Sequence, residues 1–416
     1  MTVGLVSLGC AKNAADLEVR VGRLISEGWT LAADTDRCDT LIVNTCAFIA
    51  SAREEAEREI RRALKLKREG RVGRVVVAGC YPERYPERAA LFRGVDSWEG
   101  VPKSFGCQRV PGLRLSGKAF AYLKIAEGCA HRCSYCAIPS IRGGFRSRPL
   151  RAILRDARAL VRTGVRELNL IAQDPMMYGA DIGMRSGLTG LLEKLDRMGG
   201  DFKVRVLYSY PSEITDGFLE WMRMSGRAVK YVDVPIQHTD PAILKAMARG
   251  GAVKATLSAV ERIRAAVPGV TLRTTVMTGF PGETAASFAR LLADVKRMRF
   301  DHLGVFAYSP EEGTPAAEMK GRPSAKVAEA RALRIMAAQK RIWEGKAKAM
   351  LGRTLTALVV APGVARLESQ APDVDGVVRL NASSTGRLVG CFVPVRIAGT
   401  RGYDFIGEVA GRGAGS

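Results

Sequence analysis

The chain has 416 residues, of which 47% are hydrophobic, and its formal net charge is +22 at pH 7. A chain of this length can bury more than one core, so we expect a globular protein of two or three domains. No stretch approaches the roughly 18 to 20 consecutive apolar residues of a membrane-spanning helix, and the N-terminus lacks the basic start and long apolar run of an export signal. We therefore expect a cytoplasmic protein with no membrane role.

The positive charge is concentrated in the middle of the chain. Residues 1–110 carry a net charge of +3 and residues 351–416 a net charge of +2, which leaves +17 in residues 111–350. Clustered Lys and Arg attract phosphate, so an anionic partner such as RNA or the ribosome is one interpretation. A well-solvated Arg-rich surface is the other.

Nine cysteines are too few to form a disulfide scaffold in a chain this long. In a reducing compartment, clustered cysteines indicate a metal site or catalysis instead. The nine are Cys10, Cys38, Cys46, Cys80, Cys107, Cys129, Cys133, Cys136 and Cys391.

The first 110 residues contain three units in which a β-rich run is followed by a helical pattern. The runs are TVGLVSL, DTLIVNTC and GRVVVAGC, and Cys10, Cys46 and Cys80 lie at their ends. The helical patterns are NAADLEVRVGRLISEGW, residues 51–68 and YPERYPERAALF. Because the carboxyl ends of parallel strands share one edge of a sheet, where ligands bind, we expect these three cysteines to converge.

A second alternation of strands and helices follows an irregular, Pro- and Gly-rich segment at residues 101–117, which is typical of a linker. Strands are expected at residues 120–126, 167–172, 203–208, 231–235, 270–278 and 302–309, and helices near residues 150–163, 188–198, 213–224, 241–249, 254–267 and 284–299. Six such units predict a partial (β/α)6 barrel of TIM type, whose active site lies at the carboxyl ends of its strands.

The sequence changes character after residue 350. A helix rich in Ala, Lys and Arg is predicted over residues 324–350, and from Thr354 short Val and Leu runs alternate with Gly, Pro, Asn and Ser. This pattern predicts a small antiparallel β-barrel. The fold class is therefore α/β, with an N-terminal parallel-sheet domain at residues 1–110, a barrel domain at 115–350 and a small C-terminal β-barrel domain at 351–416.

The stretch EGCAHRCSYC, residues 127–136, places three cysteines in the pattern C-x3-C-x2-C. A structural zinc site needs four ligands, whereas this stretch supplies three thiols with His131 between them. A disulfide would leave one cysteine over. A [4Fe–4S] cluster bound by three thiolates keeps one iron open for another ligand, and a short loop beside Gly128 can wrap it. We favour the cluster, with zinc and an unligated loop as the alternatives.

The C-x3-C-x2-C spacing, with Tyr135 just before the last cysteine, resembles that of the radical S-adenosylmethionine enzymes. The resemblance implies that Cys129, Cys133 and Cys136 hold a [4Fe–4S] cluster. It also implies that the open iron binds the amino and carboxylate groups of S-adenosylmethionine, which is cleaved to a radical able to abstract hydrogen.

The stretches around the other three cysteines resemble the N-terminal domain of the methylthiotransferases within that superfamily. They are SLGCAKN around Cys10, NTCAF around Cys46 and VAGCYPE around Cys80. Any one of these thiols alone is better explained as an inert buried cysteine. The resemblance implies that together they hold a second [4Fe–4S] cluster, whose open iron supplies the sulfur that is methylated and inserted into the substrate. It extends over essentially the whole chain, and the last region resembles a TRAM domain.

Several stretches resemble the RimO-type branch of this family, which modifies the β-carbon of an aspartate in ribosomal protein uS12. They are AEGCAHRCSYCAIPSIRGGFRSR, LIAQDPMMYG, YSYPSEITD, YVDVPIQHTD, GVFAYSPEEGTPAAEM and ESQAPDVDGVV, although Pro175 and its two Met neighbours depart from the branch's pattern. The resemblance implies uS12 as the protein substrate, free or within the ribosomal subunit, and an electron donor such as flavodoxin or ferredoxin.

Two other functions compete with this interpretation. One is a MiaB-type tRNA methylthiotransferase that acts on a modified adenosine next to the anticodon, and the other is a non-catalytic iron–sulfur protein that binds RNA or the ribosome. A terminal domain that grips tRNA should be strongly basic, whereas this one has a net charge of only +2. A basic target protein would suit it better, with Glu368, Asp373 and Asp375 either as contacts or as acidic turn residues in water.

Further residues at predicted strand ends are candidates for binding S-adenosylmethionine. Gln173 and Gln237 follow the second and fourth strands, Gly279 and Phe280 follow the fifth, and Arg249 could pair with the cofactor carboxylate. With Tyr135 they complete the predicted cofactor site. Alternatively, Gly279 serves a tight turn and Arg249 stabilises a helix terminus.

Three cysteines and one histidine have no such context. We expect Cys38, Cys107 and Cys391 to be structural, and His238 to be either a core residue or a substrate contact at its strand end.

Overall fold

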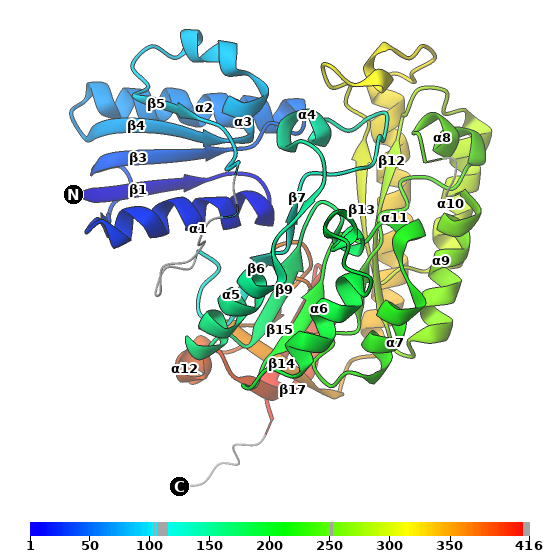
Figure 1. Cartoon of the computed structure of the whole chain (residues 1–416). Helices are drawn as coiled ribbons and strands as arrows, with labels where there is room; N and C mark the ends of the chain where they lie inside the picture. The colour runs from blue at the N-terminus through cyan, green and yellow to red at the C-terminus, as the bar shows by residue number, and fades with distance from the viewer. Residues whose placement is uncertain (104, 106–114, 250–252, 411–416) are drawn as a thin grey trace, which may run out of the picture.

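The structure is a computed structural model that describes residues 1–103, 105, 115–249 and 253–410. Cys107 and most of the predicted linker lie outside the described residues. In Figure 1 the N-terminal α/β body lies beside a curved array of strands backed by helices, and the small C-terminal barrel lies below that array.

A five-stranded parallel sheet with the order β2-β1-β3-β4-β5 forms the N-terminal body. Its strands are β1 (Thr2–Ser7), β2 (Thr30–Leu31), β3 (Cys38–Thr45), β4 (Val72–Gly79) and β5 (Ser97–Glu99), and its longer helices are α1 (Ala11–Ser26) and α2 (Ala50–Arg68). Alternate strand residues point to opposite faces. Leu41 and Val43 therefore pack with Ile60 of α2, whereas Ile42 packs with Leu17 of α1.

The third predicted helix of this body differs from the prediction. YPERYPERAALF divides into α3 (Cys80–Arg84) and a 3-10 helix, η1 (Pro86–Leu91). Pro86 has no N–H group to continue the α-helical hydrogen bonds, so the helix ends before it.

The middle of the chain contains all six predicted parallel strands. They form two three-stranded sheets, β10-β9-β6 and β11-β12-β13, and an isolated bridge joins Val204 of β10 to Ala228, just before β11. The strands are β6 (Phe120–Lys124), β9 (Glu167–Ile171), β10 (Lys203–Val206), β11 (Tyr231–Asp233), β12 (Thr271–Thr278) and β13 (His302–Ala307). This open barrel confirms the predicted fold class.

Helices cover the outer face of this barrel (Figure 1). They are α5 (Leu150–Arg162), α6 (Gly187–Asp196), α7 (Asp216–Met224), α8 (Pro241–Ala246), α9 (Val253–Ala266), α10 (Ala285–Met298) and α11 (Ala325–Lys348). Shorter elements are β7 (Ala126–Glu127), α4 (Ile138–Arg142), β8 (Arg146–Ser147) and the 3-10 helices η2 (Pro175–Met177), η3 (Ala180–Ile182), η4 (Pro211–Glu213) and η6 (Pro315–Glu318). Leu168, Leu170 and Val232 are fully buried against apolar helix residues such as Leu191 and Ile263.

The C-terminal strands close into a barrel with the order β14-β15-β16-β18-β17. The elements are β14 (Thr354–Ala361), β15 (Val364–Leu367), β16 (Val378–Arg379), α12 (Ala382–Thr385), η7 (Gly386–Leu388), β17 (Phe392–Arg401) and β18 (Asp404–Val409). The pairs are antiparallel as predicted, except that β16 and β18 are parallel. The connection through α12, η7 and β17 brings the chain back in the same direction.

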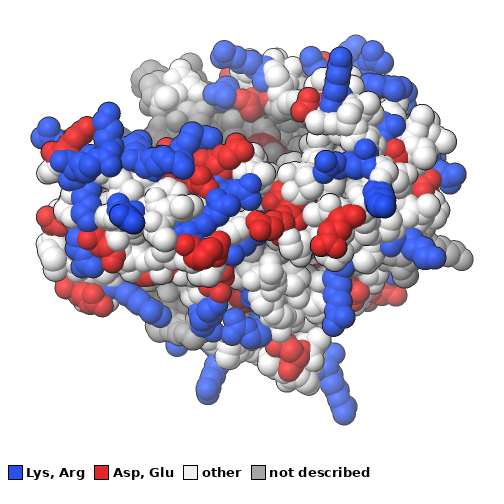
Figure 2. Space-filling model, turned by 90° about the horizontal axis from the view of Figure 1, so that it is seen from above, with Lys and Arg blue, Asp and Glu red and all other residues white. Residues whose placement is uncertain are grey.

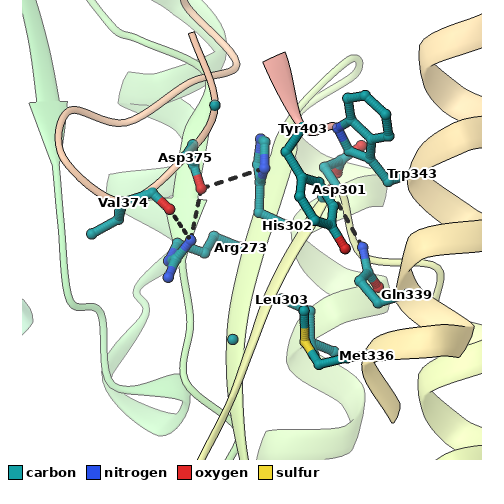
Figure 3. Close-up of a pocket in the computed structure, with 12 residues that line it drawn as sticks. Arg273, Asp301, His302, Leu303, Met336, Gln339, Trp343, Val374, Asp375 and Tyr403 are labelled. Atoms are coloured by element: carbon teal, nitrogen blue, oxygen red, sulfur yellow. Dashed lines mark hydrogen bonds and ion pairs between the residues drawn. The ribbon is translucent and has the colours of Figure 1, made fainter. Parts of the chain in front are cut away.

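The C-terminal barrel packs against the amino ends of the central strands through buried charges. Asp375 accepts hydrogen bonds from Tyr231 (2.6 Å) and Arg273 (2.6 Å) and lies 3.3 Å from His302. Figure 3 shows the last two contacts beside a small cavity of about 240 Å³. Asp373 accepts a hydrogen bond from Tyr122 (2.6 Å).

These contacts correct part of the interpretation of the terminal acids. Asp375 is a buried interdomain residue, so it does not contact a target protein. Asp373 is exposed and accepts a hydrogen bond from Tyr122, and Glu368 is half-buried and pairs with Lys203 at 3.0 Å.

The described surface carries both signs of charge. On the face shown in Figure 2, acidic side chains lie among the basic ones. None of the helices in the described part of the chain combines the length and the apolar character needed to cross a bilayer.

Candidate functional site

Three cysteines meet at the carboxyl edge of the N-terminal sheet, as the sequence predicts. β1, β3 and β4 are direct neighbours, so the turns that follow them lie side by side. Cys10 is the N-cap of α1, Cys46 follows β3, and Cys80 is the first residue of α3. Cysteines that are 36 and 34 residues apart in the sequence therefore share one site.

Asn13, which sequence reasoning missed, holds two of these turns together. Its Nδ2 donates to the carbonyls of Leu8 (2.8 Å) and Thr45 (3.0 Å), and its Oδ1 lies 4.0 Å from Cys80 Sγ. Gly9 allows the close approach, because its φ is +92° and an added Cβ would lie 2.9 Å from Cys46 Cβ. The sequence signal for Asn13 is its place in the stretch GCAKN, three residues after Cys10. In the structure Asn13 is only 1% exposed.

The second trio lies on the loop between β7 and α4. Cys129 donates its backbone N–H to Gly143 (3.2 Å), and Cys136 donates to Cys133 (3.0 Å). Gly128 has a φ of +72°, and an added Cβ there would clash with the carbonyl oxygen of Gly144. The loop therefore folds tightly on itself, and its three cysteines line the same cavity as those of the N-terminal body.

All six predicted cysteines line one cavity of about 620 Å³ between the N-terminal body and the carboxyl ends of the barrel strands. Gln173 and Arg249 line it as well, together with Lys12, His131, Arg142, Tyr208, Tyr210 and Phe306. The cavity thus combines thiols from two bodies with polar groups from the barrel.

His131 is engaged by neighbours other than the thiols. Its Nε2 lies 2.6 Å from a carboxylate oxygen of Asp174, and its ring stacks on Tyr210 with centroids 3.7 Å apart. Asp174 is buried and also caps η2 by accepting a hydrogen bond from Met176 (3.0 Å). These contacts disfavour His131 as a metal ligand beside the three cysteines of the loop.

Arg142, from α4 of the barrel domain, reaches across to the N-terminal trio. Its guanidinium donates to Asp16 (2.9 Å), to Glu127 (3.0 Å) and to Cys80 Sγ (3.4 Å). Lys124 also pairs with Asp16 and Glu127. Sequence reasoning missed this buried network, because its members are spread over 127 residues and no short motif contains them.

The thiols differ in their protonation. Burial raises the pKa of Cys80 and Cys136 to about 12 and that of Cys129 to about 11. Burial would also raise the pKa of Cys10, but the charges of Lys12 and Arg142 outweigh it and lower that pKa. Thiols with pKa values this high become metal ligands only when the metal displaces their protons.

An iron–sulfur cluster fits this donor set. In the described part of the chain, no three His, Cys, Asp or Glu side chains converge on a single metal-ion position. A [4Fe–4S] cluster does not need such convergence, because each thiolate binds a different iron. Three thiols on three separate turns could each bind one iron of such a cluster.

Two of the predicted cofactor contacts face the cavity and carry free polar atoms. Gln173 donates to Glu127 (3.0 Å), whereas its buried Oε1 has no partner within the described residues. Arg249 donates to the Pro235 carbonyl (2.7 Å) and stacks on Tyr210, whereas its buried Nε is likewise without a partner there. Both atoms are available to a ligand.

The other four predicted contacts do not line the cavity. Phe280 is fully buried and packs edge-to-face on Tyr308, in a cluster that Tyr135 joins. Gly279 lies so close to α11 that a Cβ would clash with Ala328. Gln237 has a φ of +66° and bonds through its backbone to Thr275 and Met277. Their contact with the cofactor stays a prediction.

The remaining predicted residues lie elsewhere. His238 is buried, accepts a hydrogen bond from the Asp240 backbone and has a pKa that burial lowers to about 4. Cys38 is buried in the N-terminal body, and Cys391 is exposed on the terminal barrel.

Known families and proteins match the chain over nearly its whole length. Residues 123–295 match the Radical SAM superfamily, residues 2–100 the uncharacterized protein family UPF0004 and residues 351–410 the TRAM domain. The first of these implies an iron–sulfur cluster and S-adenosylmethionine as cofactors.

Solved structures support the fold. A radical S-adenosylmethionine methyltransferase, TsrM from Kitasatospora setae, with cobalamin and a [4Fe–4S] cluster bound, superposes with a TM-score of 0.57 and 16% identity. The match covers 76% of this chain and 77% of that chain.

Curated relatives are much closer in sequence. A protein from Elusimicrobium minutum is 38% identical over 97% of this chain and 98% of its own length, and one from Syntrophus aciditrophicus is 40% identical over 98% of each. One from Geobacter sulfurreducens is 39% identical over 98% of each. All three are named ribosomal protein uS12 methylthiotransferase RimO. With this identity over the full length of both chains, the chain belongs to the RimO family of radical S-adenosylmethionine methylthiotransferases.

Proposed function

We propose that this enzyme replaces a hydrogen on the β-carbon of an aspartate in ribosomal protein uS12 by a methylthio group. The observation that carries the proposal is the single cavity of about 620 Å³, onto which both cysteine trios face. Insertion of sulfur at an unactivated carbon requires a radical source and a sulfur source within reach of the same atom. One shared cavity meets that requirement.

Two [4Fe–4S] clusters are part of the proposal. Cys129, Cys133 and Cys136 would hold one, and Cys10, Cys46 and Cys80 the other. When bound, the clusters and S-adenosylmethionine would supply the hydrogen-abstracting radical and the methylated sulfur. The thiols support this assignment, because three of them have pKa values of about 11 to 12 and stay protonated at neutral pH until a metal binds.

The barrel residues would position the cofactor. The free Oε1 of Gln173 can accept a hydrogen bond from the amino group of S-adenosylmethionine, and the guanidinium of Arg249 can bind its carboxylate. Tyr135, Gln237, Gly279 and Phe280 would support this site from the adjoining layer of packed side chains.

Each of the three domains would have a separate role. Residues 1–110 would carry the sulfur-supplying cluster, residues 115–350 the radical-generating cluster, and residues 351–416 would sit on the opposite face of the barrel. We also propose that the enzyme works in the cytoplasm on free or subunit-bound uS12, with flavodoxin or ferredoxin as electron donor.

The test is a direct comparison of substrates. The reconstituted enzyme is incubated anaerobically with reductant and S-adenosylmethionine, and with either uS12 or a tRNA anticodon stem-loop. We expect mass spectrometry to find one methylthio group on the aspartate of uS12 and none on the RNA. Modification of the RNA alone would refute the proposal in favour of a tRNA methylthiotransferase, and the absence of 5′-deoxyadenosine with both clusters intact would favour a binding protein.

A further inference from the structure

Lys12 is a cation of the cavity that lacks an ionic partner in the described part of the chain. Its Nζ lies 3.3 Å from the centroid of the Tyr208 ring, and no described carboxylate forms an ion pair with it. Arg142, by contrast, is neutralised by Asp16 and Glu127. Asp233 and Glu127 act on the Lys12 charge only at longer range, beyond ion-pair distance. A half-buried ammonium whose nearest partner is an aromatic face still has N–H donors free for an anion.

The position of Lys12 in α1 runs against local preference. It lies in the first turn of a 16-residue helix, where acidic residues are favoured and cations are not, and the turn contains no acidic residue. The amides of this turn are directed at Cys10, where they help to lower the pKa of the thiol. Residues that break a local rule are expected at functional or strained sites.

Tyr208 is held in a strained conformation beneath this ammonium. It follows β10 at the carboxyl edge of the barrel and has a φ of +73°, which an aromatic residue rarely adopts. The next residue, Ser209, fixes the turn by donating its backbone N–H to the Asp233 carbonyl (2.8 Å). The turn thus places the ring of a barrel residue under a lysine of the N-terminal body.

We propose that Lys12 binds the side-chain carboxylate of the target aspartate and thereby selects aspartate as the residue to be modified. The inference rests on the proposed function. The carboxylate of an aspartate is one bond from its β-carbon and is the only charge on that side chain. Because Lys12 spans the two bodies that carry the cysteine trios, a carboxylate on its ammonium brings the β-carbon into the space that both trios face.

The other cations of the cavity fit this role less well. Arg142 already has two carboxylate partners, and Arg249 is tied to the Pro235 carbonyl and Tyr210 beside the barrel trio. Lys12 is therefore a positioning and specificity-determining residue for the substrate.

The experiment measures peptide affinity in the reconstituted holoenzyme. Fluorescence anisotropy gives the Kd of a labelled uS12 peptide that contains the target aspartate, and of the same peptide with that residue changed to asparagine. The enzymes are the wild type, Lys12→Met, Lys12→Arg and, as a control, Lys326→Met, which removes an exposed lysine of α11. Iron content and the visible spectrum of each variant check that its clusters are intact.

We expect Lys12→Met to raise the Kd of the aspartate peptide by about 30-fold or more, as for the loss of one partner of a buried charge pair. The asparagine peptide should bind the wild type as weakly as the aspartate peptide binds Lys12→Met, and Lys12→Met should barely distinguish the two peptides. Lys12→Arg should restore part of the affinity, and Lys326→Met should match the wild type.

The outcomes separate this inference from the proposed function. If the wild type modifies the aspartate peptide but Lys12→Met binds it equally well, the inference fails and the proposed function stands. Equal binding of the two peptides by the wild type would also overturn it. If the wild type modifies no uS12 substrate, the proposed function fails and this inference with it.

Discussion

The two ends of the central barrel are covered by different bodies of the same chain, and the two junctions are built differently. At the carboxyl ends of the strands, the N-terminal body leaves a cavity of about 620 Å³ that contains thiols, an unpaired lysine and polar atoms without partners in the described residues. At the amino ends, a cavity beside the terminal barrel measures about 240 Å³, and carboxylates such as Asp375 meet several donors.

This difference indicates that the junction at the carboxyl ends binds a ligand and that the junction at the amino ends stabilises the fold. A large cavity lined by thiols and polar groups suits a ligand, whereas the dense pairing of buried charges at the amino ends suits a contact that holds two domains together, even though Gln339 Oε1 and Arg366 Nε there also lack partners in the described residues. The carboxyl end of a barrel of this type carries the active site and the amino end contributes stability. Substitutions at the two junctions should therefore have different consequences.

We call the junction at the carboxyl ends of the strands the upper junction and the one at their amino ends the lower junction. The largest effect, on iron content and activity, is expected at the upper junction when a proposed cluster ligand is removed. The wild type should bind about eight irons and as many sulfides, and Cys10→Ala or Cys129→Ala should each bind about four, because each variant loses one of two independent clusters. Both should form no methylthio product. Anaerobic iron and sulfide analysis gives the counts.

Cys391→Ala is the matched control, since Cys391 is exposed on the terminal barrel, and it should keep about eight irons. A wild type with about four irons, or a Cys10→Ala variant that keeps the full number, would contradict the two-cluster proposal.

At the lower junction, the largest expected effect is on stability. Glu167 is buried and accepts hydrogen bonds from Arg205 (3.1 Å) and Arg366 (3.0 Å), which joins the barrel to the terminal domain. Burial would raise the pKa of Glu167, but the two arginines lower it to about 2. Glu167→Gln should lower the free energy of unfolding by about 3 kcal/mol, because two buried guanidinium groups lose their counter-charge.

Chemical denaturation at pH 7 measures this change, and Glu329→Gln on the exposed face of α11 should stay within about 0.5 kcal/mol of the wild type. The iron content of Glu167→Gln should be unchanged. Loss of iron with unchanged stability would show that the two junctions are not separate in function.

The sequence predicted the upper junction better than the lower one. The cysteines lie at strand ends, and parallel strands must bring those ends together, so periodicity alone placed Cys10, Cys46 and Cys80 at one edge. The six barrel strands were equally readable from buried β-rich runs. The local sequence pattern is therefore enough to predict the barrel strands and the meeting of the three cysteines.

Contacts between bodies could not be predicted in this way. The pairing of Glu167 with Arg366 joins residues 199 positions apart, and no local pattern encodes it. For the same reason Asp375 was interpreted as a surface contact, although Tyr231 and Arg273 bury it. Asn13 and Arg142 were missed because their roles depend on which turns lie beside them in space.

A smaller effect, on the pH dependence of stability, is expected from substitution of Asp233, which lies inside the barrel between the two junctions. Burial raises its pKa to about 6, although Arg273 and Lys12 act in the opposite direction. Ionised Asp233 is therefore disfavoured in the folded state, and its contribution to stability is lost as the pH rises from the unfolded value of 3.8 through about 6.

Asp233→Asn removes this titration. Relative to the wild type, it should gain about 1 kcal/mol more stability at pH 8 than at pH 5. Denaturation curves of both proteins at the two pH values measure the difference. An equal change at both pH values would show that Asp233 is ionised normally and belongs to the paired network of the lower junction.

The smallest effect is expected at the rim of the upper cavity. Phe306, at the end of β13, lines the cavity although its side chain is 56% exposed. An exposed aromatic ring beside a cavity offers apolar surface to whatever enters, so Phe306→Ala should weaken binding of the uS12 peptide about 3- to 10-fold without changing iron content. Leu333→Ala, which removes a 71% exposed side chain from α11, is the control. If both variants bind the peptide like the wild type, substrate contacts are confined to the interior of the cavity, and its selectivity depends on charge rather than on the apolar rim.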